Sequence, residues 1–399
     1  MRGVALPALA VAAVAAVGLG SAVTCLQQDF AAYRAAGAAR RAGLDPYVNQ
    51  VTADPRLWDG VAVFQHSRFL YPPLVADLFR PLAAVPFRAA KIAFTLAMIA
   101  AWVGTAFVVA AGPARAVFLL ASVPFFPLWQ HLERGQMDLA LLLLLAVTWR
   151  ARDQVWPAGL ALAAAIAVKP ALVGVALVVA ALGRLRLAAA SLAGLAVVAG
   201  LTLALDGPAR VREYVREVAP RAGLFGEGGT EAMLLPPERL PDQPDPNSLT
   251  VEGRSYALAL WDIPTAASLP RLLAPDAPTR RAALLPFLVL FALLALCARR
   301  TAAAGGDGRW LFWGAAIASV LASPAGWIMG LVFALPLAPR LASSVARRGW
   351  PRPLSVAAGL GWLGIAAPWP VPGVAAGGAL LLLAVLAAAA TRGQPGPAA

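Results

Sequence analysis

The feature that most constrains the fold of this chain is a succession of long apolar runs separated by short charged islands. Many of the runs are about 15–20 residues long, close to the roughly 20 residues that an α-helix needs to cross a hydrocarbon core. The chain is 60% hydrophobic and 13% charged, whereas soluble domains carry about 25% charged residues. This pattern predicts an all-α polytopic membrane protein.

Basic residues follow the same pattern. A net charge of +13 would suggest nucleic-acid binding in a soluble chain. Here the arginines gather in short loops between apolar runs, where basic residues set the orientation of a membrane protein. The clearest such loops are 112–115, 149–152, 183–186, 297–300 and 340–352. We therefore expect these loops in the cytoplasm, with membrane lipids and no nucleic acid as partners. The bias to Ala, Arg, Gly and Pro is typical of bacteria, which predicts a bacterial plasma membrane protein.

The stretch GLALAAAIAVKPALVGVALVVAAL (159–182) has Lys169–Pro170 near its middle, and Lys169 is one of two lysines among 33 basic residues. Basic loops flank the stretch, so an even number of crossings must lie between them. We predict that the chain goes out over about 156–168, turns at Lys169–Pro170 and returns over about 171–182. Each limb is roughly 18 Å long, so it is stable only inside a bundle or beside a water-filled cavity. Lys169 would then line a cavity at the external face.

The same constraints give about 12 spans, within a range of about 10–13. They are expected near 4–24, 92–111, 116–130, 139–149, 156–168, 171–182, 187–205, 283–298, 310–323, 325–339, 354–369 and 373–390. Residues 25–91 then form a first external loop. Residues 206–282 hold 11 of the 20 acidic residues and form a second, larger one. We divide the chain into a module at 1–205, the external loop 206–282 and C-terminal transmembrane helices at 283–399.

The segment YPPLVADLFRPLAAVPFRAAK (71–91) is interpreted as an interfacial or re-entrant helix in the first external loop. It contains Asp77, Arg80, Arg88 and several prolines, and counting it as a span would invert the basic loops downstream. The alternative is that it does cross the membrane, in which case 159–182 is a single helix.

Polar residues gather beside the membrane ends of the predicted external side, where ionisable groups often mark a functional path. They are Asp29, Tyr33, Asp45, Tyr47, His66, Arg68, Tyr71, His131, Arg134, Gln136 and Asp138. Lys169, with such neighbours, could hold a lipid-linked phosphate while a carboxylate transfers a proton. Several of these residues could instead have a purely structural role. Asp29 could cap a helix, Lys169 could reach the headgroups and Gln136 could join two helices. The two histidines could be hydrogen-bonded surface residues.

The order of the short motifs is more specific than any one of them. DFxxY (29–33) is followed by GxDPY (43–47), YPPL (71–74), RPLAxxP (80–86), GQxD (135–138), KP (169–170) and SPAGW (323–327). This set resembles glycosyltransferase family 87 over roughly residues 20–340. Members of that family are similar to polyprenol-phosphate-mannose-dependent mannosyltransferases. Asp138 stands where the pattern has Asn.

The resemblance implies a GT-C fold, an external active site, a polyprenyl-phosphate sugar donor, a lipid or glycan acceptor, and neither cofactor nor metal. The position that matches the general base is Asp29, with Asp45 second. The base accepts the proton of the acceptor hydroxyl as that oxygen attacks C1 of the sugar, with inversion. Cations stabilise the departing phosphate, and Lys169 is the first candidate, with Arg68 and Arg134 behind it. Substrate contacts are expected from Tyr33, Tyr47, His66, Tyr71, His131, Gln136 and Asp138.

Two other functions stay open. A lipid or small-molecule transporter or flippase would share the many spans and the broken helices, and an inactive lipid-binding scaffold is a third possibility. The enzyme is favoured because the chain halves show no repeat and the polar residues concentrate on one face. An enzyme should bring Asp29, Gln136 and Lys169 into one external cavity. A transporter should place its polar residues in the middle of the bilayer.

Overall fold

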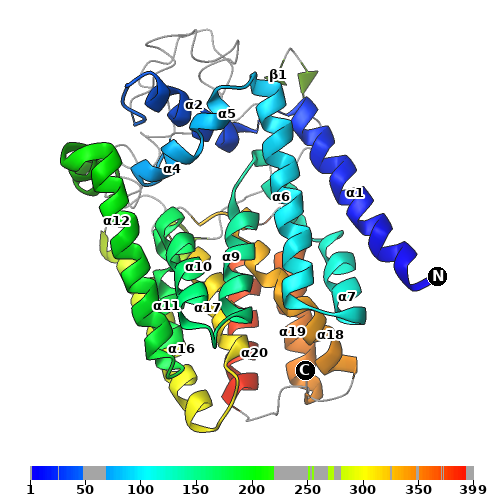
Figure 1. The fold of residues 1–399 in the computed structure, drawn as a ribbon. Coiled ribbons are helices and arrows are strands. Elements are labelled where there is room, and N and C mark those ends of the chain that lie inside the picture. Colours follow the sequence, from blue (N-terminus) through cyan, green and yellow to red (C-terminus); the bar gives the residue numbers. More distant parts are fainter. Residues whose placement is uncertain are drawn as a thin grey trace.

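The computed structural model of the protein describes residues 2–25, 27–47, 69–219, 250–251, 254–255, 268–273, 280–323, 326–346, 350–369, 371 and 373–391. Over these residues the chain is almost wholly helical (Figure 1). The exception is one antiparallel pair of short strands, β1 (Thr250–Val251) and β2 (Arg254–Ser255).

Six of the described helical segments are long and apolar enough to cross a membrane. They are α1 (Arg2–Thr24), α6 (Phe87–Val109), α12 (Leu185–Glu213) with η4 (Tyr214–Val218), α16 (Arg280–Ala303), η5 (Ile328–Leu337) with α18 (Ala338–Ala346), and α20 (Val374–Thr391). The pair α7 (Gly112–Ser122) and α8 (Phe126–Arg134), bent by 66°, makes a seventh if it is one span. An all-α polytopic membrane protein is thereby confirmed, whereas the number of about 12 spans stays a prediction.

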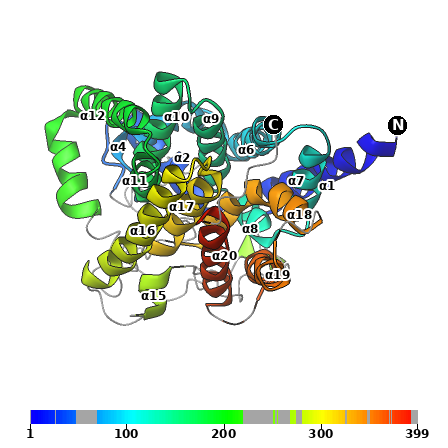
Figure 2. The ribbon, with the colours of Figure 1, turned by 90° about the horizontal axis from the view of Figure 1, so that it is seen from below.

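Several predicted spans are helices too short to cross a bilayer alone. They are α9 (Asp138–Arg150), α10 (Val155–Val168), α11 (Val173–Ala181), α17 (Arg309–Ala322) and α19 (Arg352–Ala366). All ten residues of η5 are buried, as are residues 311–322 of α17, so these elements form the centre of the molecule. In both views α1 runs along the outside of the bundle (Figures 1 and 2). The short helix α17 is therefore surrounded by protein, as its length requires.

The stretch 159–182 is broken where the sequence predicted. Helix α10 ends at Val168, Lys169 has φ −127° and ψ 89°, and η3 (Pro170–Leu172) leads into α11. A proline disfavours helical geometry in the residue before it, which explains the break at Lys169. Beyond α11, the Arg184 guanidinium donates to Asp153 Oδ1 at 2.8 Å, just before α10. The two ends of the stretch thus lie together, the chain folds back at Lys169, and the single-helix alternative is wrong.

Segment 71–91 forms two short helices instead of one, α4 (Pro73–Leu78) and α5 (Arg80–Ala83), and α6 already begins at Phe87. Both short helices pack on α2 (Gln28–Arg41), and all three lie together at one end of the bundle (Figure 1). This close packing depends on Gly37, which has no Cβ. A Cβ at this position would lie 2.6 Å from the Phe79 carbonyl group. Lys91 is buried within α6, and its ammonium donates to the Cys25 carbonyl at 2.6 Å, at the end of α1.

The described polar loops separate into two ends of the bundle. Asp153 and Arg184 meet at one end, and Gly308, at the start of α17, lies against Leu182 there. From this end α12 runs to a kink at Gly207, where φ is 75°, followed by Pro208 and η4. The helix meets α4 at the opposite end, and Asp206, just before the kink, pairs with Arg40 of α2 there. The short helix α15 (Leu269–Leu273) packs on α16 and α17.

Candidate active site

The centre of the candidate site is the side chain of Gln136, in the turn between α8 and α9. Its amide nitrogen Nε2 donates to Asp29 Oδ2 at 2.8 Å, in the first turn of α2. Its amide oxygen Oε1 accepts from the Tyr33 hydroxyl at 2.9 Å and from the Tyr71 hydroxyl at 3.4 Å. The two hydroxyls are 3.0 Å apart. Four predicted site residues from three separate parts of the chain therefore form one hydrogen-bonded group.

Gly135 permits this meeting of α2 with the turn. Its φ is 70°, and an added Cβ would lie 2.7 Å from Phe30 Cβ and 2.9 Å from Gln27 Cβ. Gln27 also has a left-handed backbone, with φ 54°, and its side chain donates to the Leu132 carbonyl at 2.9 Å. The glycine of the GQxD motif thus serves both a left-handed turn and a close backbone approach.

An ion pair forms the second half of the site. The Lys169 ammonium lies 2.9 Å and 3.0 Å from the two carboxylate oxygens of Asp138. The Asp138 side chain is 2% exposed and that of Lys169 18% exposed. Helix η5 packs against this ion pair. A Cβ on its Gly330 would lie 3.5 Å from Asp138 Oδ2, and the centroid of its Phe333 ring lies 5.9 Å from Lys169 Nζ.

Both halves share the turn 135–138, since Gln136 holds Asp29 and Asp138 holds Lys169. The structure therefore brings Asp29, Gln136 and Lys169 to the same turn, whereas the predicted external cavity around them stays a prediction. They meet where α9 begins and α10 ends, not in the middle of a long helix.

His131 and Arg134 lie beside this site on α8. The fully buried His131 ring accepts the backbone N–H of Leu139 at its Nε2, at 3.1 Å, so it caps the first turn of α9. This contact differs from the predicted substrate contact and gives His131 a structural role. Arg134 is close enough to Asp29 and Glu133 for their charges to interact.

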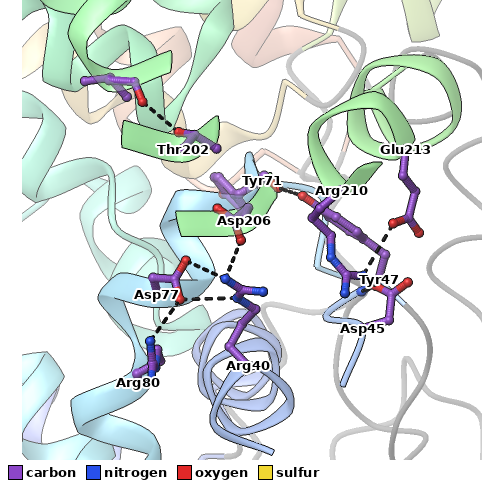
Figure 3. Close-up of polar contacts among 11 residues, drawn as sticks. Arg40, Asp45, Tyr47, Tyr71, Asp77, Arg80, Thr202, Asp206, Arg210 and Glu213 are labelled. Atoms are coloured by element: carbon purple, nitrogen blue, oxygen red, sulfur yellow. Dashed lines mark hydrogen bonds and ion pairs between the residues drawn. The ribbon is translucent and has the colours of Figure 1, made fainter. Parts of the chain in front are cut away.

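Asp45 belongs to a separate group of ion pairs (Figure 3). Its carboxylate lies 2.8 Å from the Arg210 guanidinium and accepts the backbone N–H of Tyr47. Arg40, on α2, pairs with Asp77 and with Asp206. These pairs fasten the kinked end of α12 to α2 and α4. Asp45 thus pairs with the end of α12.

Tyr47 connects the two groups. Its hydroxyl donates to the Tyr71 carbonyl at 2.9 Å, and its ring stacks on Tyr214 at 6.0 Å between centroids. Burial, followed by the charge of Asp138, raises the pKa of Tyr71 above its usual range. Burial, followed by the neighbouring Tyr71, raises the pKa of Tyr33 well above its usual range. Both phenols therefore remain protonated at physiological pH and can donate hydrogen bonds.

Two predicted residues, His66 and Arg68, lie outside the described residues. Sequence reasoning missed Gly330 and Phe333, although the SPAGW motif immediately precedes η5 and was a usable signal. It also missed Arg40, Asp206 and Arg210, because the charge pattern placed Asp206 at the start of a loop.

Comparison with known proteins agrees with the motif order. The profile of glycosyltransferase family 87 matches residues 69–236. This segment includes Tyr71, Gln136, Asp138 and Lys169, whereas the motifs that contain Asp29 and Asp45 precede it. No curated protein and no solved structure gives a significant match. The resemblance that the motifs suggested over roughly 20–340 is thus confirmed over 69–236, the segment that matches glycosyltransferase family 87.

Proposed function

We propose that this protein transfers a sugar, with mannose as the first candidate, from a polyprenyl phosphate to a lipid or glycan acceptor. The reaction takes place at the external face of a bacterial plasma membrane, on a GT-C fold. It inverts the sugar and uses Asp29 as general base. The observation that carries the proposal is the placement of Asp29 and Lys169 on either side of the turn 135–138.

The reaction needs a base and an anion site. The acceptor oxygen attacks C1 of the sugar and gives its proton to the Asp29 carboxylate. The bond from C1 to the phosphate oxygen breaks at the same time, and the lipid phosphate leaves with the electron pair. That leaving group is already anionic, so no protonated acid, metal or further cofactor is needed.

Lys169 is suited to the phosphate because an ammonium has three N–H donors, and two Asp138 oxygens lie within hydrogen-bond distance of it. Its side chain is more exposed than that of Asp138, so an incoming anion can reach it. Arg134 is the second candidate, close to Asp29. Arg68 remains a candidate from the sequence.

The distribution of charged loops supports an external site. Arg184 and the loop 149–153 lie at one end of the bundle, and α9 leads from there to Asp138 at the other. Basic loops favour the cytoplasm. The site lies at the opposite end, as an externally acting enzyme requires.

The test is transfer from radiolabelled polyprenyl-phosphate mannose in membranes of a deletion strain that carries the gene or a variant. Asp29→Asn is expected to lower the initial rate by at least about 100-fold, with expression and membrane insertion unchanged. Asp45→Asn is the control, because Asp45 is paired with Arg210 and should matter less. Near-normal turnover by Asp29→Asn would refute the assignment of Asp29 as the base. If only Asp45→Asn lost transfer activity, Asp45 would be the base instead. No label transfer by the unaltered protein, against the deletion strain, would reject this donor.

A further inference from the structure

We infer that Gln136 is a positioning residue for the Asp29 carboxylate, and that Tyr33 and Tyr71 fix the orientation of its amide. This inference rests on the proposed function, because it assumes that Asp29 is the base. It revises the sequence prediction of Gln136, Tyr33 and Tyr71 as substrate contacts.

The two ends of the Gln136 amide have different partners. An amide donates through nitrogen and accepts through oxygen, and a half-turn of the group exchanges the two. In the observed orientation Nε2 is 2.8 Å from Asp29 Oδ2, and Oε1 receives the Tyr33 hydroxyl at 2.9 Å. The opposite orientation would set an amide oxygen against a carboxylate oxygen, two acceptors with no proton between them.

The tyrosines hold the amide in the productive orientation. Tyr33 is 2% exposed, and its ring packs edge-on against Tyr71 with 5.2 Å between centroids. The Tyr71 hydroxyl lies 3.0 Å from that of Tyr33 and 3.4 Å from Gln136 Oε1, as a second donor. Tyr71 is fixed in turn, because its carbonyl accepts the Tyr47 hydroxyl.

These contacts fix the orientation of the Asp29 carboxylate and favour its ionised form. Asp29 is 8% exposed, and burial of a charge is costly unless hydrogen bonds compensate it. A hydrogen bond donated to a carboxylate favours its ionised form, which is the form that accepts a proton. Both polar ends of Gln136 have protein partners, which favours positioning over substrate contact.

Other titratable groups also act on Asp29, and the test must separate them from Gln136. They are Tyr33 on α2, Tyr71 ahead of α4 and Arg134 on α8, with Glu133 and Asp138 acting in turn on Arg134 and on the two tyrosines. Gln136, by contrast, is a neutral amide. Its substitution by Met therefore removes a donor without changing the charge.

The experiment measures the initial transfer rate against pH, at low donor concentration, in the membrane assay described above. The transfer rate falls as the base becomes protonated, which gives the profile an acid limb. Without the Gln136 donor, ionisation of Asp29 requires a higher pH. Gln136→Met should therefore shift the acid limb upward by about one pH unit. Gln136→Glu should shift it further, because a second carboxylate would stand against Asp29.

Gln130→Met is the matched control. Gln130 is fully buried on α8, and its Nε2 donates to Glu133 Oε2 at 3.1 Å instead of to Asp29. Any loss in this variant should be equal at all pH values. The pair Tyr33→Phe and Tyr71→Phe should shift the acid limb in the same direction as Gln136→Met, but less. If Gln136→Met does not accumulate in membranes, Gln136→Glu, which retains the size and the acceptor for Tyr33, decides in its place.

The inference is overturned if the Gln136 variants lose activity equally at all pH values, as Gln130→Met does. That outcome would leave the proposed function intact, provided that Asp29→Asn is inactive. Retained turnover in Asp29→Asn would instead remove the base itself, and with it the need for a positioning residue.

Discussion

The Lys169–Asp138 pair shows how single residues shape this site. A lysine inside an apolar stretch must have its charge compensated, and Asp138 does this with both oxygens. The cost of removing charges from water is large, and loss of one partner leaves the other charge buried alone.

Lys169→Met is expected to destabilise the protein by about 3 kcal/mol, because it strands the buried Asp138 carboxylate. The double variant Lys169→Met with Asp138→Asn removes both charges at nearly constant shape and should regain most of that stability. It should not regain use of the polyprenyl-phosphate donor. Thermal unfolding in detergent and donor dependence of the transfer rate measure the two effects. Recovery of both in the double variant would show that Lys169 serves only to neutralise Asp138.

At the scale of elements, the site depends on how closely α8, α9 and α2 approach one another. The turn 135–138 joins α8 to α9 and lies on the first turn of α2. Short helices such as α10 and α11 then bring the KP turn to the same place.

Gly135→Ala should lower both stability and activity. The backbone of residue 135 is left-handed, a conformation that costs a non-glycine residue about 1–2 kcal/mol. The Cβ of the alanine would also lie 2.7 Å from Phe30 Cβ. Gly183→Ala is the control for backbone strain alone, since its φ is 80° but an added Cβ meets nothing within 4 Å. We expect Gly183→Ala to lose some thermal stability while its transfer rate, per folded protein, stays normal. Equal loss of rate in the two variants would argue against the importance of the close approach.

For the whole molecule, the two ends of the bundle have different roles. The end with Asp153 and Arg184 carries basic loops, and the other end carries α2, α4, α5 and the candidate site. The positive-inside rule predicts that the basic end faces the cytoplasm, which is the orientation that the proposed external reaction requires.

Cysteine labelling in intact cells tests this orientation. After Cys25 and Cys297 are replaced by serine, single cysteines are introduced at exposed positions, Leu44 near the site and Arg186 at the basic end. A membrane-impermeant maleimide should label Leu44→Cys in intact cells and Arg186→Cys only after lysis. The reverse pattern would place the site in the cytoplasm and exclude the proposed external reaction.

Much of the fold was predictable because its signals are local. Apolar runs predict membrane helices wherever they occur, and Pro170 restricts the residue before it regardless of the rest of the chain. The sequence therefore predicted the break at Lys169 and the gathering of polar residues on one side. It misjudged segment 71–91, because two short helices and one surface helix have the same composition.

The amino-acid sequence by itself determined the membrane class, the broken stretch 159–182 and the motif order that matches family 87 from residue 69 to 236. Only the tertiary structure decided the partner of each polar group. Gln136 donates a hydrogen bond to Asp29, 107 residues away in the sequence. Lys169 forms an ion pair with Asp138, and Asp45 forms one with Arg210. The reason is physical: hydropathy and proline act within a few residues, whereas a hydrogen bond between distant residues exists only once packed helices have brought its two atoms within about 3 Å.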